Sequence, residues 1–361
     1  MNKEIIKKNG VVFDGIIYFF CCFDIGDDVD FKNIMTKSHF FHSSYKKSRY
    51  KTQNILLSVD INKIEFTKSC ISASLYNFGV LSFRYAFPFS VPLEELKSII
   101  NKTLDLVETY SYNDGKAIFN EIKDSVREST FFNLSKTYVL IQCDTKDGIT
   151  PYDFKNNFGH EISSLLRFEN EVLSEYKKNE ILENGFGYYR GDLLIIDVNS
   201  AIIYDNDYGD ILDIFEYANI KHMELQFFDK SLDTQLNFSY DRRSFHVSFL
   251  SYLPIIGMMQ FNPIEELAKL RVDISVVCER LWSSIKFSDD PYYLEIYHML
   301  DKKLEFDSWQ KSIDKKLEII SHILETHEYK IINMRHDFQN LLIILLIFLE
   351  TLLAVLHFFC Y

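Results

Sequence analysis

The sequence lacks the short motifs that identify most enzymes and metal proteins. It contains no C-x-x-C pair, no H-E-x-x-H pair, no G-x-x-x-x-G-K-[ST] loop and no G-x-S-x-G turn. These motifs normally mark zinc or thiol redox sites, metalloproteases, nucleotide-binding loops and serine hydrolases. Their absence predicts no metal and no cofactor. It leaves enzymatic activity uncertain, with a non-enzymatic role favoured.

The chain also lacks an unusual overall composition. Its 361 residues are 47% hydrophobic and 25% charged, and the formal net charge is −13. These averages exclude a disordered chain, a collagen-like repeat and a membrane protein with many spans. The acidic balance argues against a general nucleic-acid binder. The six cysteines show no disulfide framework, so we expect buried free thiols in a reducing compartment.

One segment departs from this average. The 21 residues Leu341–Tyr361 contain only three residues outside the apolar set, namely Glu350, Thr351 and His357, and no Lys, Arg, Gly or Pro. A bilayer core needs about 20 apolar helical residues, so the run predicts one C-terminal transmembrane helix over 341–359. A buried core helix is the alternative. The predicted membrane anchor residues are Leu341, Ile344, Leu345, Phe348, Glu350, Leu353 and Leu356.

Charges beside this run predict the topology. Lys330 and Arg335 precede it, and the positive-inside bias then keeps the bulk of the chain in the cytoplasm. Glu350 falls in the middle of the span, where a carboxylate is costly unless it is protonated or faces a partner. We favour a helix–helix contact between protomers for Glu350. A proton site and a neutral glutamate hidden in a small bundle are the alternatives.

A heptad pattern precedes the apolar run. From about Ser308 the sequence shows no helix break, and apolar residues alternate at spacings of three and four, as in coiled coils. Two further helical patterns precede it within Asn262–Phe306, and Phe287–Pro291 breaks the first and caps the second. The heptads therefore either join a second protomer or pack on the preceding helices as a hairpin. The predicted oligomer seam is Ile313, Leu317, Ile320, Leu324, Ile331, Met334 and Phe338.

The remainder predicts an α+β domain, with helices on one face of a mostly antiparallel sheet, followed by the helical hairpin or coiled-coil stalk and the transmembrane helix. The predicted domains are 1–261, with two subdomains divided near 130–150, the stalk 262–340 and the span 341–359. The expected strands are a pair within Val11–Phe23, Asn54–Ile61, a bent pair within Ser72–Phe87, Thr137–Gln142, Leu193–Ile196 and Ala201–Tyr204. The expected helices are Leu93–Tyr110, Lys116–Arg127, Pro151–Arg167, Glu171–Leu182 and one from Gly209 to about Leu236.

One basic patch interrupts the acidic surface. Lys37–Lys51 contains no acid and interleaves basic residues with aromatic ones. Basic residues contact phosphates and aromatic rings stack on bases, so the patch is a candidate contact for anionic lipid or RNA. A solvated loop is the alternative. The residues that would carry the contact are Lys46, Lys47, Arg49 and Lys51.

The C-terminal third resembles the membrane proteins named for "required for meiotic nuclear division" and their uncharacterised bacterial relatives. The resemblance rests on Phe287–Pro291, Tyr297, Leu304-Glu305, Ile313–Leu317, His336 and the span with Glu350, and upstream on Tyr76–Pro88 and Gly191–Asp197. It implies a single C-terminal span, self-association and a scaffold role. Phe287 stands where the family has tryptophan, and no transit peptide is recognisable. A bacterial-type inner membrane is therefore favoured over the mitochondrial inner membrane.

These observations lead to two functional hypotheses. The first is a tail-anchored membrane scaffold or tether that self-associates through its stalk, with a cytosol-facing α+β domain and an unknown protein partner. The second is a membrane-anchored enzyme or effector that acts on nucleic acid or nucleotide without a recognisable motif.

Overall fold

The computed structural model describes residues 10–26, 28–37, 41–42, 56–59, 69–127, 129–131, 135–169, 171–183, 185–241, 268, 272 and 291–360. The chain divides into two compact units. The first comprises Met1–Phe227 with Glu279–Ser308, and the second comprises Phe228–Cys278 with Trp309–Tyr361. The domain boundaries predicted at 261 and 340 stay predictions, and the helical pattern that begins at Asn262 lies almost wholly outside the described residues.

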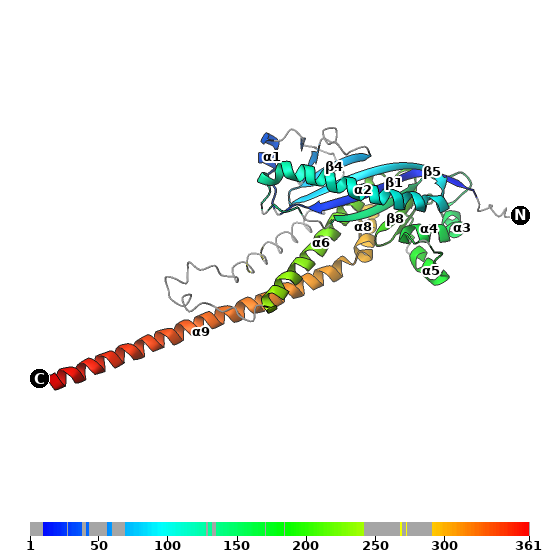
Figure 1. Ribbon diagram of the computed structural model, residues 1–361. Helices are drawn as coiled ribbons and strands as arrows, with labels where there is room; N and C mark the ends of the chain where they lie inside the picture. Colours follow the sequence, from blue (N-terminus) through cyan, green and yellow to red (C-terminus); the bar gives the residue numbers. More distant parts are fainter. Residues whose placement is uncertain are drawn as a thin grey trace. The chain divides into compact units, whose positions relative to one another are not determined.

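A mixed sheet forms the centre of the first unit (Figure 1). Its strands lie in the order β2-β3-β4-β5-β1-β6-β8-β7, and every neighbouring pair is antiparallel except β6 and β8, which are parallel. The strands are β1 (Val12–Asp24), β2 (Phe41–His42), β3 (Leu56–Val59), β4 (Cys70–Tyr76), β5 (Val80–Pro92), β6 (Ser135–Cys143), β7 (Leu193–Ile196) and β8 (Ser200–Tyr204). The predicted mostly antiparallel sheet is confirmed in this form.

The central strand β1 corrects one prediction. The apolar run Val11–Phe23 forms a single strand of 13 residues and not a strand pair. Gly15 does not make a turn there. A Cβ atom at this position would lie 2.0 Å from the Gln142 carbonyl oxygen of β6, so glycine permits close approach of the two strands. Both faces of β1 are buried, which explains its nearly continuous apolar sequence.

The hairpin of β4 and β5 confirms the predicted bend at Gly79. This glycine has φ of +89°, in the left-handed region that residues with a Cβ atom rarely adopt. The Gly79 amide donates to the Tyr76 carbonyl, and the Ile25 amide donates to the Gly79 carbonyl. The turn therefore also fixes the chain that leaves β1.

Helices α2, α3, α4 and α5 cover one face of the sheet (Figure 1). The predicted break near Tyr110 is wrong, because α2 runs without interruption over 30 residues. The predicted single helix Pro151–Arg167 is instead two helices, and Phe158 ends the first of them with non-helical backbone angles. The helices of the first unit include α1 (Phe31–Lys37), α2 (Leu93–Ile122), the 3-10 turn η2 (Lys123–Ser125), α3 (Pro151–Asn157), α4 (Gly159–Arg167), α5 (Glu175–Glu183) and α8 (Pro291–Lys303).

The opposite face of the sheet is also covered, so the prediction of helices on one face is wrong. The N-terminal part of α6 (Gly209–Asp241) packs there. The Asn219 amide donates to the carbonyl oxygens of Phe20 in β1 and Lys136 in β6, at 3.0 and 3.1 Å. The prediction missed this because α6 carries polar residues on its buried side, which the apolar periodicity does not reveal.

The second unit contains the C-terminal part of α6 and nearly all of α9 (Phe306–Cys360), a helix of 55 residues. The prediction of one unbroken helix from about Ser308 into the apolar run is confirmed. Asp229 of α6 accepts hydrogen bonds from Ser312 and Lys316 of α9, at 2.6 and 2.7 Å. The two helices therefore pair within one chain at this point.

Candidate functional site

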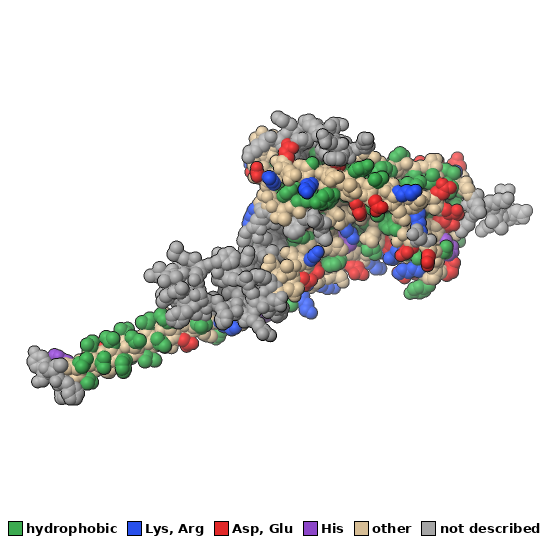
Figure 2. All heavy atoms as spheres, viewed as in Figure 1, with side chains coloured by type: hydrophobic (Ala, Val, Ile, Leu, Met, Phe, Trp, Pro, Cys, Tyr) green, Lys and Arg blue, Asp and Glu red, His purple; other side chains and the backbone are tan. Residues whose placement is uncertain are grey.

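The C-terminal part of α9 is the largest apolar surface among the described residues (Figure 2). Its segment Ile332–His357 is 26 residues long and apolar enough to cross a membrane, and none of its most apolar window is buried. Leu341 is 60% exposed and Ile344 is 67% exposed, values that are unusual for large aliphatic side chains in water. All seven predicted anchor residues lie on this helix with exposed side chains: Leu341, Ile344, Leu345, Phe348, Glu350, Leu353 and Leu356.

The predicted seam divides into two parts along α9. Ile313 and Ile320 are fully buried, and Leu317 and Leu324 are half-buried. Farther along, Met334 is 44% exposed and Phe338 is half-buried, while the side chain of Ile331 is outside the described ones. The first part of the seam is thus covered within the chain. A coiled coil with a second protomer stays a prediction.

Ionic contacts accompany the covered part of the seam. The Lys316 ammonium lies 2.7 Å from carboxylate oxygens of both Asp229 and Asp233 on α6. These carboxylates raise the pKa of Lys316 above its ordinary value, although desolvation by itself would lower it. The charge on Lys316 therefore favours the α6–α9 pairing.

Glu350 does not continue the seam. It follows Leu345 by five residues and Leu341 by nine, which on a helix turns it about 140° and about 180° away from them. Its own side of the helix carries Ile343 and His357, one heptad before and after it. A single helix therefore presents two faces, an aliphatic seam and a face that carries Glu350 within the apolar run. The predicted contact between protomers at Glu350 stays a prediction.

The basic residues that would carry the predicted contact of the patch Lys37–Lys51 lie outside the described residues. This applies to Lys46, Lys47, Arg49 and Lys51, so the candidate lipid or RNA contact stays a prediction.

A buried charge network in the first unit was missed by the sequence reasoning. Arg84 of β5 forms ion pairs with Asp213, at 2.6 Å, and with Glu216, both on α6. Ser82 of β5 also donates to the Glu216 carboxylate, at 2.6 Å. Burial alone would lower the pKa of Arg84, but the two carboxylates raise it above its ordinary value, so the guanidinium stays charged. The available signal was an arginine inside an otherwise apolar strand.

A second buried carboxyl group lies on the other face of the sheet. Asp114 of α2 is fully buried, and the Tyr85 hydroxyl donates to its Oδ2 atom at 2.9 Å. Its Oδ1 atom has no hydrogen-bond partner among the described residues. Burial raises the pKa of Asp114 to about 6, against the opposing effect of the Tyr85 hydrogen bond. This carboxyl group therefore titrates in the mildly acidic range.

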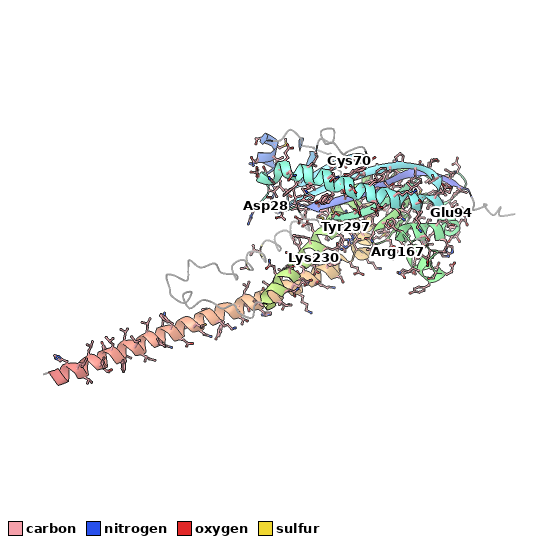
Figure 3. All side chains as sticks on the ribbon, viewed as in Figure 1. Asp28, Cys70, Glu94, Arg167, Lys230 and Tyr297 are labelled. Carbon is pink, nitrogen blue, oxygen red and sulfur yellow. The ribbon has the colours of Figure 1, made fainter. Side chains whose placement is uncertain are left out.

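A third buried carboxylate joins three elements of the first unit. Asp197, after β7, lies 2.5 Å from Nε of Arg167 at the end of α4 and 3.0 Å from the ammonium of Lys303 at the end of α8. Arg167 is labelled in Figure 3. The Tyr138 hydroxyl donates to the Asp197 carbonyl oxygen at 2.8 Å. Because the carboxylate pairs with one cation from each of two helices, it attaches the β7–β8 turn to the ends of both α4 and α8.

The four cysteines whose side chains are described are free and buried, as expected: Cys21, Cys22, Cys70 and Cys143. Burial raises the pKa of Cys21 and of Cys70 to about 12, so these thiols stay protonated and unreactive at neutral pH. In the parts of the chain that the structure describes, no group of three His, Cys, Asp or Glu side chains could hold a metal ion. The buried charges of the first unit thus connect elements of the fold, while the exposed apolar surface lies on α9.

Comparisons with known proteins match the part of the chain that contains the sheet. Residues 14–210, which run from β1 to the start of α6, match the family model "Uncharacterized protein MJ0711, N-terminal domain". The chain is 26% identical to the uncharacterised protein MJ0711 of Methanocaldococcus jannaschii over 272 residues, which cover 74% of this chain and 79% of that protein. It is 31% identical to the UPF0354 protein YtpQ of Bacillus subtilis over 105 residues, 28% of this chain and 38% of that protein.

No solved structure matches the chain significantly. The family model covers more than half of the chain, from the first strand of the sheet to the helix that packs on its second face. The predicted resemblance to uncharacterised proteins is therefore supported, whereas the resemblance to the "required for meiotic nuclear division" proteins stays a prediction. The chain belongs to the family defined by the N-terminal domain of MJ0711.

Proposed function

We propose that this protein is a membrane-anchored scaffold, held in the bilayer by α9 and carrying its α+β unit on the cytoplasmic side. The observation that carries the proposal is the exposed apolar surface of Ile332–His357. In water, this much exposed aliphatic surface is unfavourable, at about 25 cal/mol per Å². In a bilayer the same surface is solvated, and the helix satisfies its own backbone hydrogen bonds.

Two further features support the scaffold role. The α6–α9 pairing gives the apolar helix a folded attachment at Asp229, Ser312 and Lys316. The self-association without catalysis that the sequence of the C-terminal third predicts is kept as a part of the proposal for experiment to test. Lys330 and Arg335 precede the uncharged start of the apolar run at Leu341 and favour a cytoplasmic bulk, in a bacterial-type inner membrane.

The anchor is tested by fractionation of the full chain. We expect it to remain in the membrane pellet after alkaline carbonate extraction. The variant L345K/F348K/L353K keeps the helix length but adds three charges, each costly at the bilayer centre, and it should become extractable. The matched control Y152K/V172K/Y176K changes three exposed side chains of the first unit and should stay in the membrane. Extraction of the unaltered chain would contradict the anchor.

Self-association and orientation need separate measurements. Mass photometry of the full chain in detergent should show an oligomer, and a strict monomer would contradict this part of the proposal. An N-terminal tag should be digested by protease in inverted membrane vesicles and protected in intact cells. The reverse pattern would contradict the cytoplasmic placement.

A further inference from the structure

We propose that the Glu350 face of α9 binds the transmembrane helix of a different membrane protein, and that this helix carries a lysine or arginine near its centre. The inference rests on the proposed function, since it requires α9 to lie in a bilayer. It names the chemistry of the partner, which the membrane proposal leaves open.

The first argument is the position of Glu350 within the apolar segment. It is the only acidic residue of 341–360 and lies near the middle of that run, with an exposed side chain. Charged residues inside membrane spans are rare because hydrocarbon solvates them poorly, and they usually pair with another group. A cation on a neighbouring helix provides such a group, and charge complementarity then selects the partner.

The second argument is the separation of the two faces. Leu341 and Leu345, the residues that extend the seam, lie about 180° and about 140° around the helix from Glu350. A second copy that used the seam would leave Glu350 on the outside of the pair. Two parallel copies that used the opposite face would instead place one Glu350 against the other, an arrangement that like charges disfavour.

The third argument is the local surface beside the carboxylate. Ala354 follows Glu350 by four residues and so lies on nearly the same face, one turn farther along. Small residues allow close approach of helices in membranes, where packing replaces the hydrophobic effect as the driving force. The face therefore combines a carboxylate with a site at which a second backbone can approach.

The test uses the full chain in phosphatidylcholine vesicles with synthetic leucine-based helices of about 20 residues. One helix carries a central lysine, one carries only leucine, and one carries a central glutamate. Each has a photo-crosslinking residue one turn from its centre. We expect the lysine helix to crosslink to the full chain about five- to tenfold more than the leucine helix, an effect of 1.0–1.4 kcal/mol at about 1.4 kcal/mol per tenfold.

Variants locate the contact. E350Q should reduce crosslinking of the lysine helix to the level of the leucine helix. A354F should reduce it by blocking close approach. L345Q and V355F are the matched controls, because they introduce a comparable amide or ring on the other side of α9, and they should leave crosslinking unchanged.

The outcomes separate the alternatives. Equal crosslinking of all three helices would overturn the proposal. A second form of the chain carries the photo-crosslinking residue at Ile347, one turn before Glu350 on the same side of the helix. Crosslinks between two copies of this form that disappear in E350Q, without preference for the lysine helix, would assign the face to a second copy and would also overturn the proposal. If the full chain fails to float with the vesicles, the membrane anchor itself is wrong. Flotation alone measures that failure. A chain that floats with the vesicles but shows no preference for the lysine helix would instead contradict only the present inference.

Discussion

Arg84 and Glu216 form an ion pair although their side chains are only 7% and 8% exposed, and they join the sheet to the helix on its second face. Removing one member of a buried pair leaves the other charge without compensation, at a cost of about 3–5 kcal/mol. The pair therefore makes the packing of α6 on β5 sensitive to the loss of either charge.

The first prediction concerns this pair. R84M should lower the free energy of unfolding by about 3–5 kcal/mol, because Glu216 would keep only the Ser82 hydroxyl as a described partner. D213N should lower it by less than about 1 kcal/mol, since that side chain is 36% exposed and water compensates for its loss. Urea denaturation of the full chain in detergent micelles measures both. Equal effects would show that Asp213, and not Glu216, is the main partner.

The second prediction is a pH dependence that originates at Asp114. Its folded-state pKa of about 6 exceeds the unfolded value of about 3.9. The folded state therefore binds more protons between these values, and its stability falls as the pH rises through this range. The loss should amount to roughly 2–3 kcal/mol, complete above pH 6. D114N should be more stable than the unaltered chain at pH 7.5 and should not show this slope.

Denaturation curves between about pH 4 and pH 8 provide the measurement for Asp114. Y85F is the informative companion. Loss of its hydroxyl removes the hydrogen bond that lowers the Asp114 pKa, so the slope should extend to higher pH. A D114N curve parallel to that of the unaltered chain would refute the assignment.

The third prediction separates pairing within the chain from contact with another molecule. Ile320 is fully buried in the second unit, whereas Met334 on the same helix is 44% exposed. I320A should weaken amide protection in 309–324 and 228–241 by an amount equivalent to about 2–5 kcal/mol. M334A should leave that protection unchanged. Hydrogen exchange with mass spectrometry measures both, and equal loss of protection would contradict the division of the seam.

The fourth prediction concerns the thiols. Cys21 and Cys70 have pKa values raised to about 12 by burial, and both side chains are inaccessible. Maleimide should therefore modify them in the folded chain only at the rate of unfolding, and at once in denaturant. C21S and C70S identify the modified sites by mass spectrometry. Rapid modification at neutral pH without denaturant would show that this part of the core opens locally.

The sequence predicted the helices and strands that are determined by residues close together in the chain. The hairpin at Gly79, the strands β7 and β8, and the length of α9 follow from turn chemistry and apolar periodicity. Local sequence did not predict that α2 is one continuous helix. Its middle contains Ser111, Asp114 and Gly115, all weak helix formers. All three are buried, and a Cβ atom at Gly115 would lie 3.3 Å from Phe131, so tertiary packing and not local propensity selects them.

The buried charges were missed for a different reason. Arg84 and Glu216 are separated by 132 residues, and the local sequence around either residue does not identify its partner. The same holds for Asp197 and Lys303, which join the end of β7 to the end of α8. Charge pairs of this kind depend on tertiary distance, whereas the apolar run of α9 is visible from composition alone.

The unbroken course of α9 has a mechanical consequence. Over its 55 residues the helix contains neither proline nor glycine, the residues at which helices most often bend. From Trp309 onward it belongs to one unit and extends about 75 Å. Such a helix behaves as a torsionally stiff rod. A rotation imposed on the segment around Glu350 therefore turns Ser312 and Lys316 against Asp229 of α6. Under the proposed membrane placement, a change of neighbours around Glu350 becomes a torque on the paired helices.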